Sequence, residues 1–163
     1  MVKAIYPGSF DPVTLGHLDI ALRAGRLFDE VVVAVYDKPP KNILFSTDER
    51  IKLWEDSLPP ESNISVVSYK GLTVELAHDL GAKALVRGLR ALSDFEYELE
   101  MALTNKRMAG DIESVFMMSS HEYLYLSSTR IKELWGMGFA LSEMVPANVD
   151  RALRAKLGAP GTK

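Results

Sequence analysis

A run of six residues, 31–36, constrains the fold of this 163-residue chain more than any other stretch. Its sequence, Val-Val-Val-Ala-Val-Tyr, does not alternate between apolar and polar side chains, as a strand with one exposed face would. A strand that is apolar on both faces is typical of a parallel sheet covered by helices on both sides. The run therefore predicts an α/β protein.

The rest of the chain alternates between short apolar runs and stretches with apolar residues at helical spacing. Strands are predicted at residues 2–6, 31–36, 64–68, 83–86 and 113–118, and helices at about 16–28, 50–58, 73–80, 93–108, 128–134 and 147–157. Strand–helix alternation favours right-handed crossovers between parallel strands. We therefore predict a Rossmann-like, doubly wound sheet of five parallel strands with helices on both faces, in one domain spanning residues 1–163.

Local signals support individual helices. Ser46 and Glu49 form a capping-box pattern before the second helix, and Gly81 is suited to end the third. The long helix at 93–108 has an apolar stripe along one side, made of Leu92, Phe95, Leu99, Ala102 and Leu103. Such a stripe is typical of a helix that packs on a core.

Composition excludes several classes of function. The formal net charge of −3 argues against a general nucleic-acid binder, which needs a basic face. The absence of cysteine excludes disulfides, thiolate catalysis and cysteine metal sites. No apolar run approaches the roughly 20 residues of a membrane span, and no signal-peptide pattern is present. We expect a cytoplasmic globular protein with no nucleic-acid or membrane partner.

The stretch from residue 4 to 17 combines a strand, a glycine turn and the start of a helix. Gly8 allows a ligand to approach the backbone, Pro12 stiffens the turn, and Thr14 is placed to cap the helix. The first N–H groups of a helix lack partners within it and attract anions, and His17 adds a side-chain donor. The pattern suits a phosphate, although an ordinary turn with a helix-capping histidine would look the same.

Candidate site residues, among them most of the chain's unusual polar residues, follow each predicted strand. They are Ser9, Phe10 and His17 after the first, Lys41 after the second, Gly71, Leu72 and Thr73 after the third, Arg87, Gly88 and Arg90 after the fourth, and Ser127, Ser128 and Thr129 after the fifth. Because ligands of such sheets bind outside the carboxyl ends of the strands, these residues should converge. Their convergence predicts an active site at one edge of the sheet.

Two arginines stand out within the apolar run after the fourth strand. Arg87 and Arg90 are three residues apart, and guanidinium groups bind phosphate oxygens in pairs. A buried ion pair with Asp94, Glu96 or Glu98 is the structural alternative. Both interpretations can hold, with the acids orienting the arginines.

Two groups of motifs carry a family resemblance. Gly8-Ser9-Phe10-Asp11-Pro12 and the core Thr14-Leu15-Gly16-His17 resemble the first signature of the nucleotidyltransferase superfamily. Further matches are Arg87-Gly88-Leu89-Arg90 with the acidic stretch 94–98, then residues 113–116, Ser127-Ser128-Thr129 and Ile131-Lys132-Glu133. In this length and order they resemble the phosphopantetheine adenylyltransferase family over nearly the whole chain.

The resemblance implies transfer of the adenylyl group of ATP to 4′-phosphopantetheine, giving dephospho-CoA and pyrophosphate in coenzyme A biosynthesis. It also implies Mg²⁺, expected on the ATP phosphates without a protein metal site, a homohexamer, and dephospho-CoA or CoA as product or feedback ligand. The family's substrate contacts map to Ser9, Lys41, Thr73 and Arg87. Its ATP contacts map to Ser9, Phe10, His17, Gly88, Leu89, Arg90, Glu98, Tyr123, Leu124, Tyr125, Leu126, Ser127, Ser128 and Thr129. Ser9 replaces a threonine of many members and keeps the hydroxyl, whereas Thr73 replaces other residues and would bind through its backbone.

A direct in-line mechanism follows from these residues. The sequence contains no Cys and no Ser–His pair that would indicate a covalent intermediate. The acceptor phosphate is itself a nucleophile. Positioning and electrostatic stabilisation then supply most of the rate. The catalytic residues are His17, which should donate to the α-phosphate, and Lys41, which should bridge it and the nucleophile.

Two alternatives remain open from the sequence. One is an enzyme of the same fold that makes NAD or a CDP-alcohol, against which the acceptor-side stretch 72–98 argues. The other is a non-catalytic nucleotide sensor, which would be expected to lack His17 or Lys41.

Overall fold

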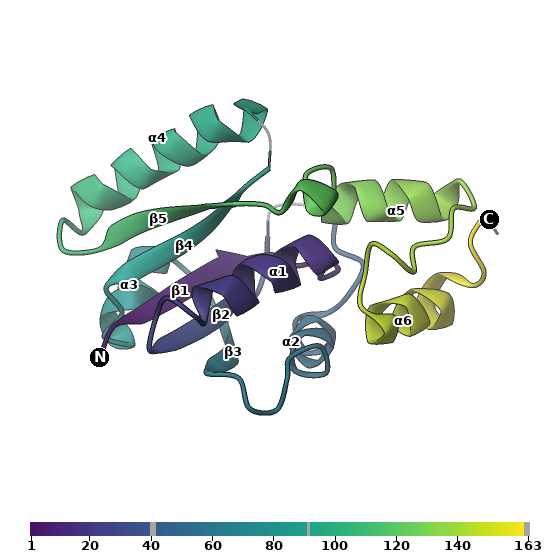
Figure 1. The fold of residues 1–163 in the computed structure, drawn as a ribbon, viewed down its shortest axis with the longest axis horizontal. Coiled ribbons are helices and arrows are strands. Elements are labelled where there is room, and N and C mark those ends of the chain that lie inside the picture. Colours follow the sequence, from purple (N-terminus) through teal and green to yellow (C-terminus); the bar gives the residue numbers. More distant parts are fainter. Residues whose placement is uncertain (40–41, 91, 162–163) are drawn as a thin grey trace.

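The computed structural model describes residues 1–39, 42–90 and 92–161, with side chains described outside 92–94. One parallel sheet runs through the molecule in the order β3-β2-β1-β4-β5 (Figure 1). Its strands are β1 (Lys3–Gly8), β2 (Glu30–Tyr36), β3 (Ile64–Tyr69), β4 (Ala84–Leu89) and β5 (Glu113–Met118). The predicted five-stranded parallel sheet is confirmed, and strand order reverses between β1 and β4.

Helices cover both faces of this sheet. They are α1 (Leu15–Ala24), α2 (Thr47–Glu55), α3 (Thr73–Asp79), α4 (Leu92–Met108), the short 3₁₀ helix η1 (His121–Tyr123), α5 (Ser128–Gly136) and α6 (Ala147–Leu157). In Figure 1, α5 and α6 lie beyond the carboxyl ends of the strands, while α4 runs along the β5 side of the sheet. The doubly wound prediction is therefore confirmed.

The apolar run in β2 is buried on both faces, as its composition predicts. Val31, Val33 and Val35 belong to one core cluster, which also contains buried residues of α1, α2, α5 and α6. Val32 and Ala34 point to the other face and pack in a second cluster with residues of α3. Alternate side chains of one strand thus contribute to two separate cores, which fixes the register of the sheet.

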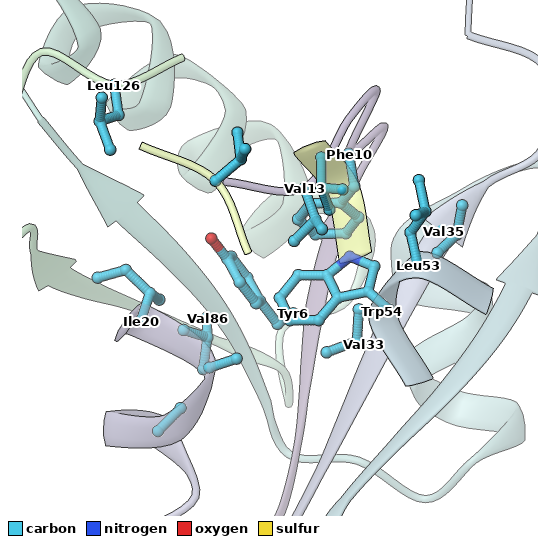
Figure 2. Packing of buried hydrophobic residues seen from close by; sticks show 14 of the residues in the cluster. Tyr6, Phe10, Val13, Ile20, Val33, Val35, Leu53, Trp54, Val86 and Leu126 are labelled. Carbon is cyan, nitrogen blue, oxygen red and sulfur yellow. The ribbon is translucent and has the colours of Figure 1, made fainter. Parts of the chain in front are cut away.

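An aromatic group extends the first core up to the turn after β1 (Figure 2). Phe10 packs edge-on against Tyr6 and Trp54, with ring centroids 5.3 and 5.0 Å away. Its backbone is left-handed, with φ of 50°, and its ring covers Gly8 so closely that a Cβ there would lie 2.6 Å from it. Glycine is therefore required at position 8 for packing of the turn.

Most helix signals are confirmed, but some bounds shift. The capping box of Ser46 and Glu49 is present before α2, and Gly81 follows α3 with φ of 65°. Helix α1 ends earlier than predicted, at Ala24, because Gly25 takes the C-cap position. None of the described helices is long and apolar enough to cross a membrane.

The predicted apolar stripe of α4 does not face the core. Of its described members, Phe95, Leu99 and Leu103 are exposed, and Leu103 retains 64% of its accessible surface. Helical spacing identified side chains that share a face, but it did not reveal what covers them. Helix α4 therefore presents an open apolar face at Phe95, Leu99 and Leu103, while the exposed Tyr97, Met101 and Met108 lie on another side of the helix.

Candidate active site

A cleft of about 380 Å³ opens where the strand order reverses, at the carboxyl ends of β1 and β4. It is bordered by the turn after β1, the first turn of α1, the end of β4 and the N-terminus of α5. The predicted site residues that line it are Ser9, Phe10, His17, Arg87, Gly88, Arg90, Glu98, Leu126, Ser127, Ser128 and Thr129. Segments far apart in the sequence thus meet at the predicted edge of the sheet.

Other predicted site residues do not line this cleft. They are Thr73, Leu89, Tyr123, Leu124 and Tyr125, while Lys41 lies outside the described residues. Leu89 is buried at the end of β4, and Tyr125, which follows η1, is 88% exposed. The fourth strand also runs further than predicted, so Arg87 and Gly88 lie inside β4 rather than after it.

His17 is held in one orientation by the first turn of α1. The backbone N–H of Thr14 donates to Nδ1 of His17 at 3.1 Å, and the backbone N–H of His17 donates to Oγ1 of Thr14 at 3.3 Å. The ring of Phe10 packs edge-on against the imidazole, with centroids 5.2 Å apart. Because Nδ1 accepts a backbone N–H, the proton of the neutral ring lies on Nε2. His17 therefore caps the helix through Nδ1 and carries its proton on Nε2.

The N-terminus of α1 has fewer free N–H groups than the sequence suggests. The N–H of Leu15 donates to the carbonyl of Met144 at 2.9 Å, and that of His17 is used by the cap. A phosphate at this turn would therefore be held by the N–H of Gly16 and the imidazole of His17 rather than by a complete set of N–H groups.

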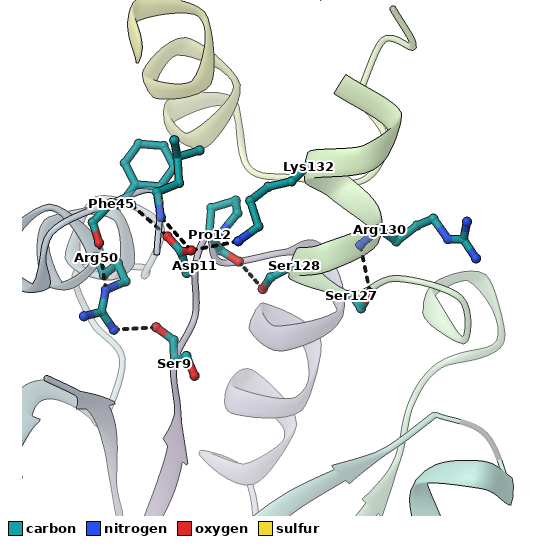
Figure 3. Close-up of polar contacts among 10 residues, drawn as sticks. Ser9, Asp11, Pro12, Phe45, Arg50, Ser127, Ser128, Arg130 and Lys132 are labelled. Atoms are coloured by element: carbon teal, nitrogen blue, oxygen red, sulfur yellow. Dashed lines mark hydrogen bonds and ion pairs between the residues drawn. The ribbon is translucent and has the colours of Figure 1, made fainter. Parts of the chain in front are cut away.

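A second helix N-terminus, that of α5, is joined to the turn after β1. The hydroxyl of Ser128 donates to the carbonyl of Pro12 at 2.7 Å (Figure 3). Ser127 caps α5 by accepting the N–H of Arg130 at 3.1 Å, and Arg90 donates to the carbonyl of Leu126 at 2.9 Å. The two positive helix ends are thus fixed on the same cleft, where they favour an anionic ligand.

Arg87 forms the ion pair that the sequence left open as an alternative. Its Nε and one terminal nitrogen each donate to a carboxylate oxygen of Glu98 at 2.6 Å, and the other terminal nitrogen donates to the carbonyl of Pro7 at 3.2 Å. Burial opposes the charge of Arg87, but Glu98 outweighs it and raises the pKa of the guanidinium. A substrate phosphate that binds Arg87 must therefore share it with Glu98 or displace that carboxylate.

Asp11 organises the polar side of the same turn (Figure 3). It is 1% exposed and accepts the backbone N–H groups of Leu44 and Phe45 at 2.8 and 2.9 Å, and the ammonium of Lys132 at 2.9 Å. Burial would raise the pKa of Asp11, but the hydrogen bonds from Lys132 and the two N–H groups together lower it. The carboxylate therefore stays charged and joins α5 to the segment before α2.

Sequence reasoning missed several residues around the cleft. Tyr6, Tyr36 and Tyr69 line it although they lie within strands and look like core residues. Arg50 also escaped notice because a charged residue in a helix is usually exposed, whereas here it is fully buried. A tyrosine at the carboxyl end of an otherwise aliphatic strand was the available signal for Tyr36.

A second cleft of about 430 Å³ adjoins the first and shares Arg87, Glu98, Tyr36 and Tyr69 with it. It extends along the start of α3 and the side of α4 that carries Tyr97, Met101 and Met108. Thr73 lies here, with its hydroxyl 3.0 Å from that of Tyr69. The Arg87–Glu98 pair therefore stands between a polar cleft suited to phosphates and a less polar one suited to an extended chain.

Comparisons with known proteins agree with this geometry. The family described as cytidylyltransferase-like matches residues 5–134. A solved structure provisionally assigned as a nicotinate-nucleotide adenylyltransferase of Vibrio parahaemolyticus has a TM-score of 0.71 at 20% identity, and covers 95% of this chain and 93% of its own. That likeness concerns the fold. The fold, the cleft and the family match define a nucleotidyltransferase of the cytidylyltransferase-like class.

Curated relatives narrow the class to one family. A phosphopantetheine adenylyltransferase of Desulforudis audaxviator is 51% identical over 99% of both chains. Proteins with the same name from Desulfitobacterium hafniense and Thermosynechococcus vestitus are 50% and 51% identical, over 94% and 93% of this chain and 94% and 90% of their own. The chain belongs to the phosphopantetheine adenylyltransferase family.

Proposed function

We propose that this chain transfers the adenylyl group of ATP to 4′-phosphopantetheine, giving dephospho-CoA and pyrophosphate. A phosphate oxygen of the acceptor attacks the α-phosphorus of ATP, and the bond from this phosphorus to the oxygen that bridges it to the β-phosphorus breaks. The observation that carries the proposal is a cleft with two helix N-termini, His17 and two arginines, in a chain about half identical to named phosphopantetheine adenylyltransferases.

The residues of the cleft divide between the two substrates. His17 donates from Nε2 to the α-phosphate, where negative charge grows in the transition state. The family resemblance assigns Ser9, Arg87 and Lys41 to the acceptor phosphate, with Lys41 also reaching the α-phosphate. The end of β4 and the N-terminus of α5 hold the nucleotide. The second cleft, beside Thr73, takes the pantetheine arm.

Mg²⁺ belongs to the proposal as an ion carried by ATP. Among the described residues, no group of three or more His, Asp or Glu side chains is placed to hold a metal, and Glu98 is engaged by Arg87. The described side chains therefore offer no cage for the ion, and the proposed ligands are phosphate oxygens and water. Bound there, the ion would neutralise charge on the phosphates.

Assembly and location complete the proposal. We propose a cytoplasmic homohexamer that has no nucleic-acid or membrane partner and that binds dephospho-CoA or CoA in the same cleft as product or feedback ligand. The open apolar surface of α4 supports association with other copies of the chain, because exposed apolar patches commonly mark interfaces.

Release of pyrophosphate tests the function directly. The purified chain with Mg²⁺ should release it from ATP plus 4′-phosphopantetheine, and far more slowly from ATP plus nicotinamide mononucleotide or from CTP plus phosphocholine. A preference for either rival pair would contradict the proposal in favour of an NAD-forming or CDP-alcohol-forming enzyme. Tight ATP binding without turnover of any pair would instead indicate a nucleotide sensor.

A further inference from the structure

Arg50 is a fully buried cation on α2. Its guanidinium donates to the carbonyl oxygens of Ser9, Tyr36, Asp37 and Phe45 and to the hydroxyl of Thr47, at 2.7–3.1 Å. A guanidinium has five N–H groups, so each of them has an acceptor. Figure 3 shows Arg50 between Ser9 and Phe45, beside the turn that borders the cleft.

The charge of Arg50 is not matched by a direct ion pair within the described part of the chain. Asp11 and Asp37 are the carboxylates that act on it, but Asp11 binds Lys132 and Asp37 binds Lys70. Burial lowers the pKa of Arg50, and the two carboxylates only partly restore it. Because burying a charge among neutral acceptors is costly, a role in stability alone is a poor explanation of this residue.

The acceptors of Arg50 lie on three segments that meet at the phosphate end of the cleft. Ser9 belongs to the turn after β1, Tyr36 ends β2 and is followed by Asp37, and Phe45 precedes α2. The last two segments are the described flanks of the β2–α2 loop. Asp11 holds the same loop from its other side, because it accepts the N–H of Phe45 while Arg50 binds the carbonyl of that residue.

We propose that Arg50 is a positioning residue for the acceptor phosphate, which holds the Ser9 turn in register with both flanks of the β2–α2 loop. The inference rests on the proposed function, in which Ser9 and a residue of that loop, Lys41, bind this phosphate. Ser9 is also assigned to the nucleotide, but most of the nucleotide's assigned contacts lie at the end of β4 and in residues 123–129, which Arg50 does not contact. Loss of its hydrogen bonds should therefore weaken the acceptor's binding more than the nucleotide's.

Arg50→Lys is the central variant, because it keeps the charge but has three N–H donors instead of five. Binding of ATP and of 4′-phosphopantetheine should be measured separately by calorimetry, alongside steady-state kinetics. We expect kcat/KM for 4′-phosphopantetheine to fall about 10²-fold, as small misplacements of reacting groups do, while the Kd for ATP changes less than about twofold. Thr47→Val, which removes one acceptor, should shift the same parameters in the same direction by less.

Leu53→Ala is the matched control on α2, since it removes buried apolar volume and leaves all five hydrogen bonds of Arg50 in place. It should lower the melting temperature without separating the two affinities. If Arg50→Lys and Thr47→Val behave like Leu53→Ala, with both ligands affected equally or not at all, the positioning role is overturned. Measurements on the wild-type chain distinguish failure of the positioning role from failure of the proposed function. If the wild-type chain binds no 4′-phosphopantetheine, the proposed function itself has failed.

Discussion

The turn after β1 and helix α4 border the two adjoining clefts, but they are built in opposite ways. In the turn, Asp11 and Thr14 are buried polar residues whose oxygens accept hydrogen bonds from the backbone. Along α4, Tyr97 and Leu103 are apolar or aromatic residues left exposed. The buried polar groups of the turn find their hydrogen-bond partners within the same chain, whereas α4 has an apolar surface that the chain itself does not cover.

This difference separates what catalysis needs from what assembly needs. Groups that stabilise a transition state must be oriented before the substrate arrives, which the fixed hydrogen bonds of the turn achieve. An open apolar helix can instead be completed by another copy of the chain. Substitutions in the turn should therefore change kcat or acceptor affinity in each protomer, while substitutions on α4 should first change the oligomeric state.

The largest effect is expected for His17→Ala. The α-phosphate gains charge only in the transition state, so loss of a preorganised donor should lower kcat about 10²–10³-fold, while KM for ATP stays within a few-fold. Glu49→Ala is the control, because it removes the corresponding side chain from the capping box of α2. A large rise in KM for ATP at unchanged kcat would make His17 a ground-state binding residue instead.

The next effect concerns Arg87, which joins the two clefts. Arg87→Met should weaken 4′-phosphopantetheine binding by about 10–100-fold, the range for a lost charged hydrogen bond, with little change for ATP. Glu98→Gln sharpens the test, because it releases Arg87 from its carboxylate partner. Calorimetry that shows equal losses for both ligands in Arg87→Met would contradict the division of the site between the substrates.

A smaller effect is expected for the open surface of α4. Leu103→Asp places a charge on the exposed apolar face and should weaken assembly by about 2 kcal/mol per contact, enough to populate smaller species at micromolar concentration. Light scattering of the wild-type chain should give a hexamer, and that of Leu103→Asp a lower mass. Lys70→Asp is an exposed control outside this face and should leave the mass unchanged. A wild-type monomer at micromolar concentration would refute the hexamer.

The sequence was sufficient to predict the elements of the fold wherever the signal came from residues close together in the chain. The run at 31–36 predicted a strand buried on both faces, and β5 and α6 have the predicted bounds. The predicted end of β4, at residue 86, was wrong because Arg87 interrupts the apolar pattern. A charged residue can stay inside the strand there because Glu98, on a different element, neutralises it.

The site was predictable to the extent that it lies at strand ends. Ser9, His17, Arg90 and Ser128 meet in one cleft because parallel strands direct their carboxyl ends to the same edge. The network that holds them was not predictable, since Lys132 pairs with Asp11 across 121 residues and Arg50 reaches Ser9 across 41. Periodicity and local spacing contain no information about such partners.

The smallest effect is expected for Asp11→Asn, which tests whether the turn is held by charge. The amide can still accept hydrogen bonds from Leu44 and Phe45 but cannot pair with Lys132, so the free energy of unfolding at neutral pH should fall by about 1–2 kcal/mol. Asp56→Asn removes an exposed pair with Lys52 and should change it by less than about 0.5 kcal/mol. Urea unfolding of all three proteins measures these differences.

The pH dependence of the Asp11→Asn difference identifies its cause. The folded state lowers the pKa of Asp11 below its ordinary value of 3.8, so the stability that the charge contributes is fully present above that value. It is lost as the pH falls below 3.8 through the folded pKa, because the carboxyl then becomes neutral like the amide. The difference between wild type and Asp11→Asn should therefore be constant from neutral pH down to about pH 5 and shrink toward about pH 3. A difference that did not change over this range would mean that the shape of the side chain, and not its charge, fixes the turn beside His17.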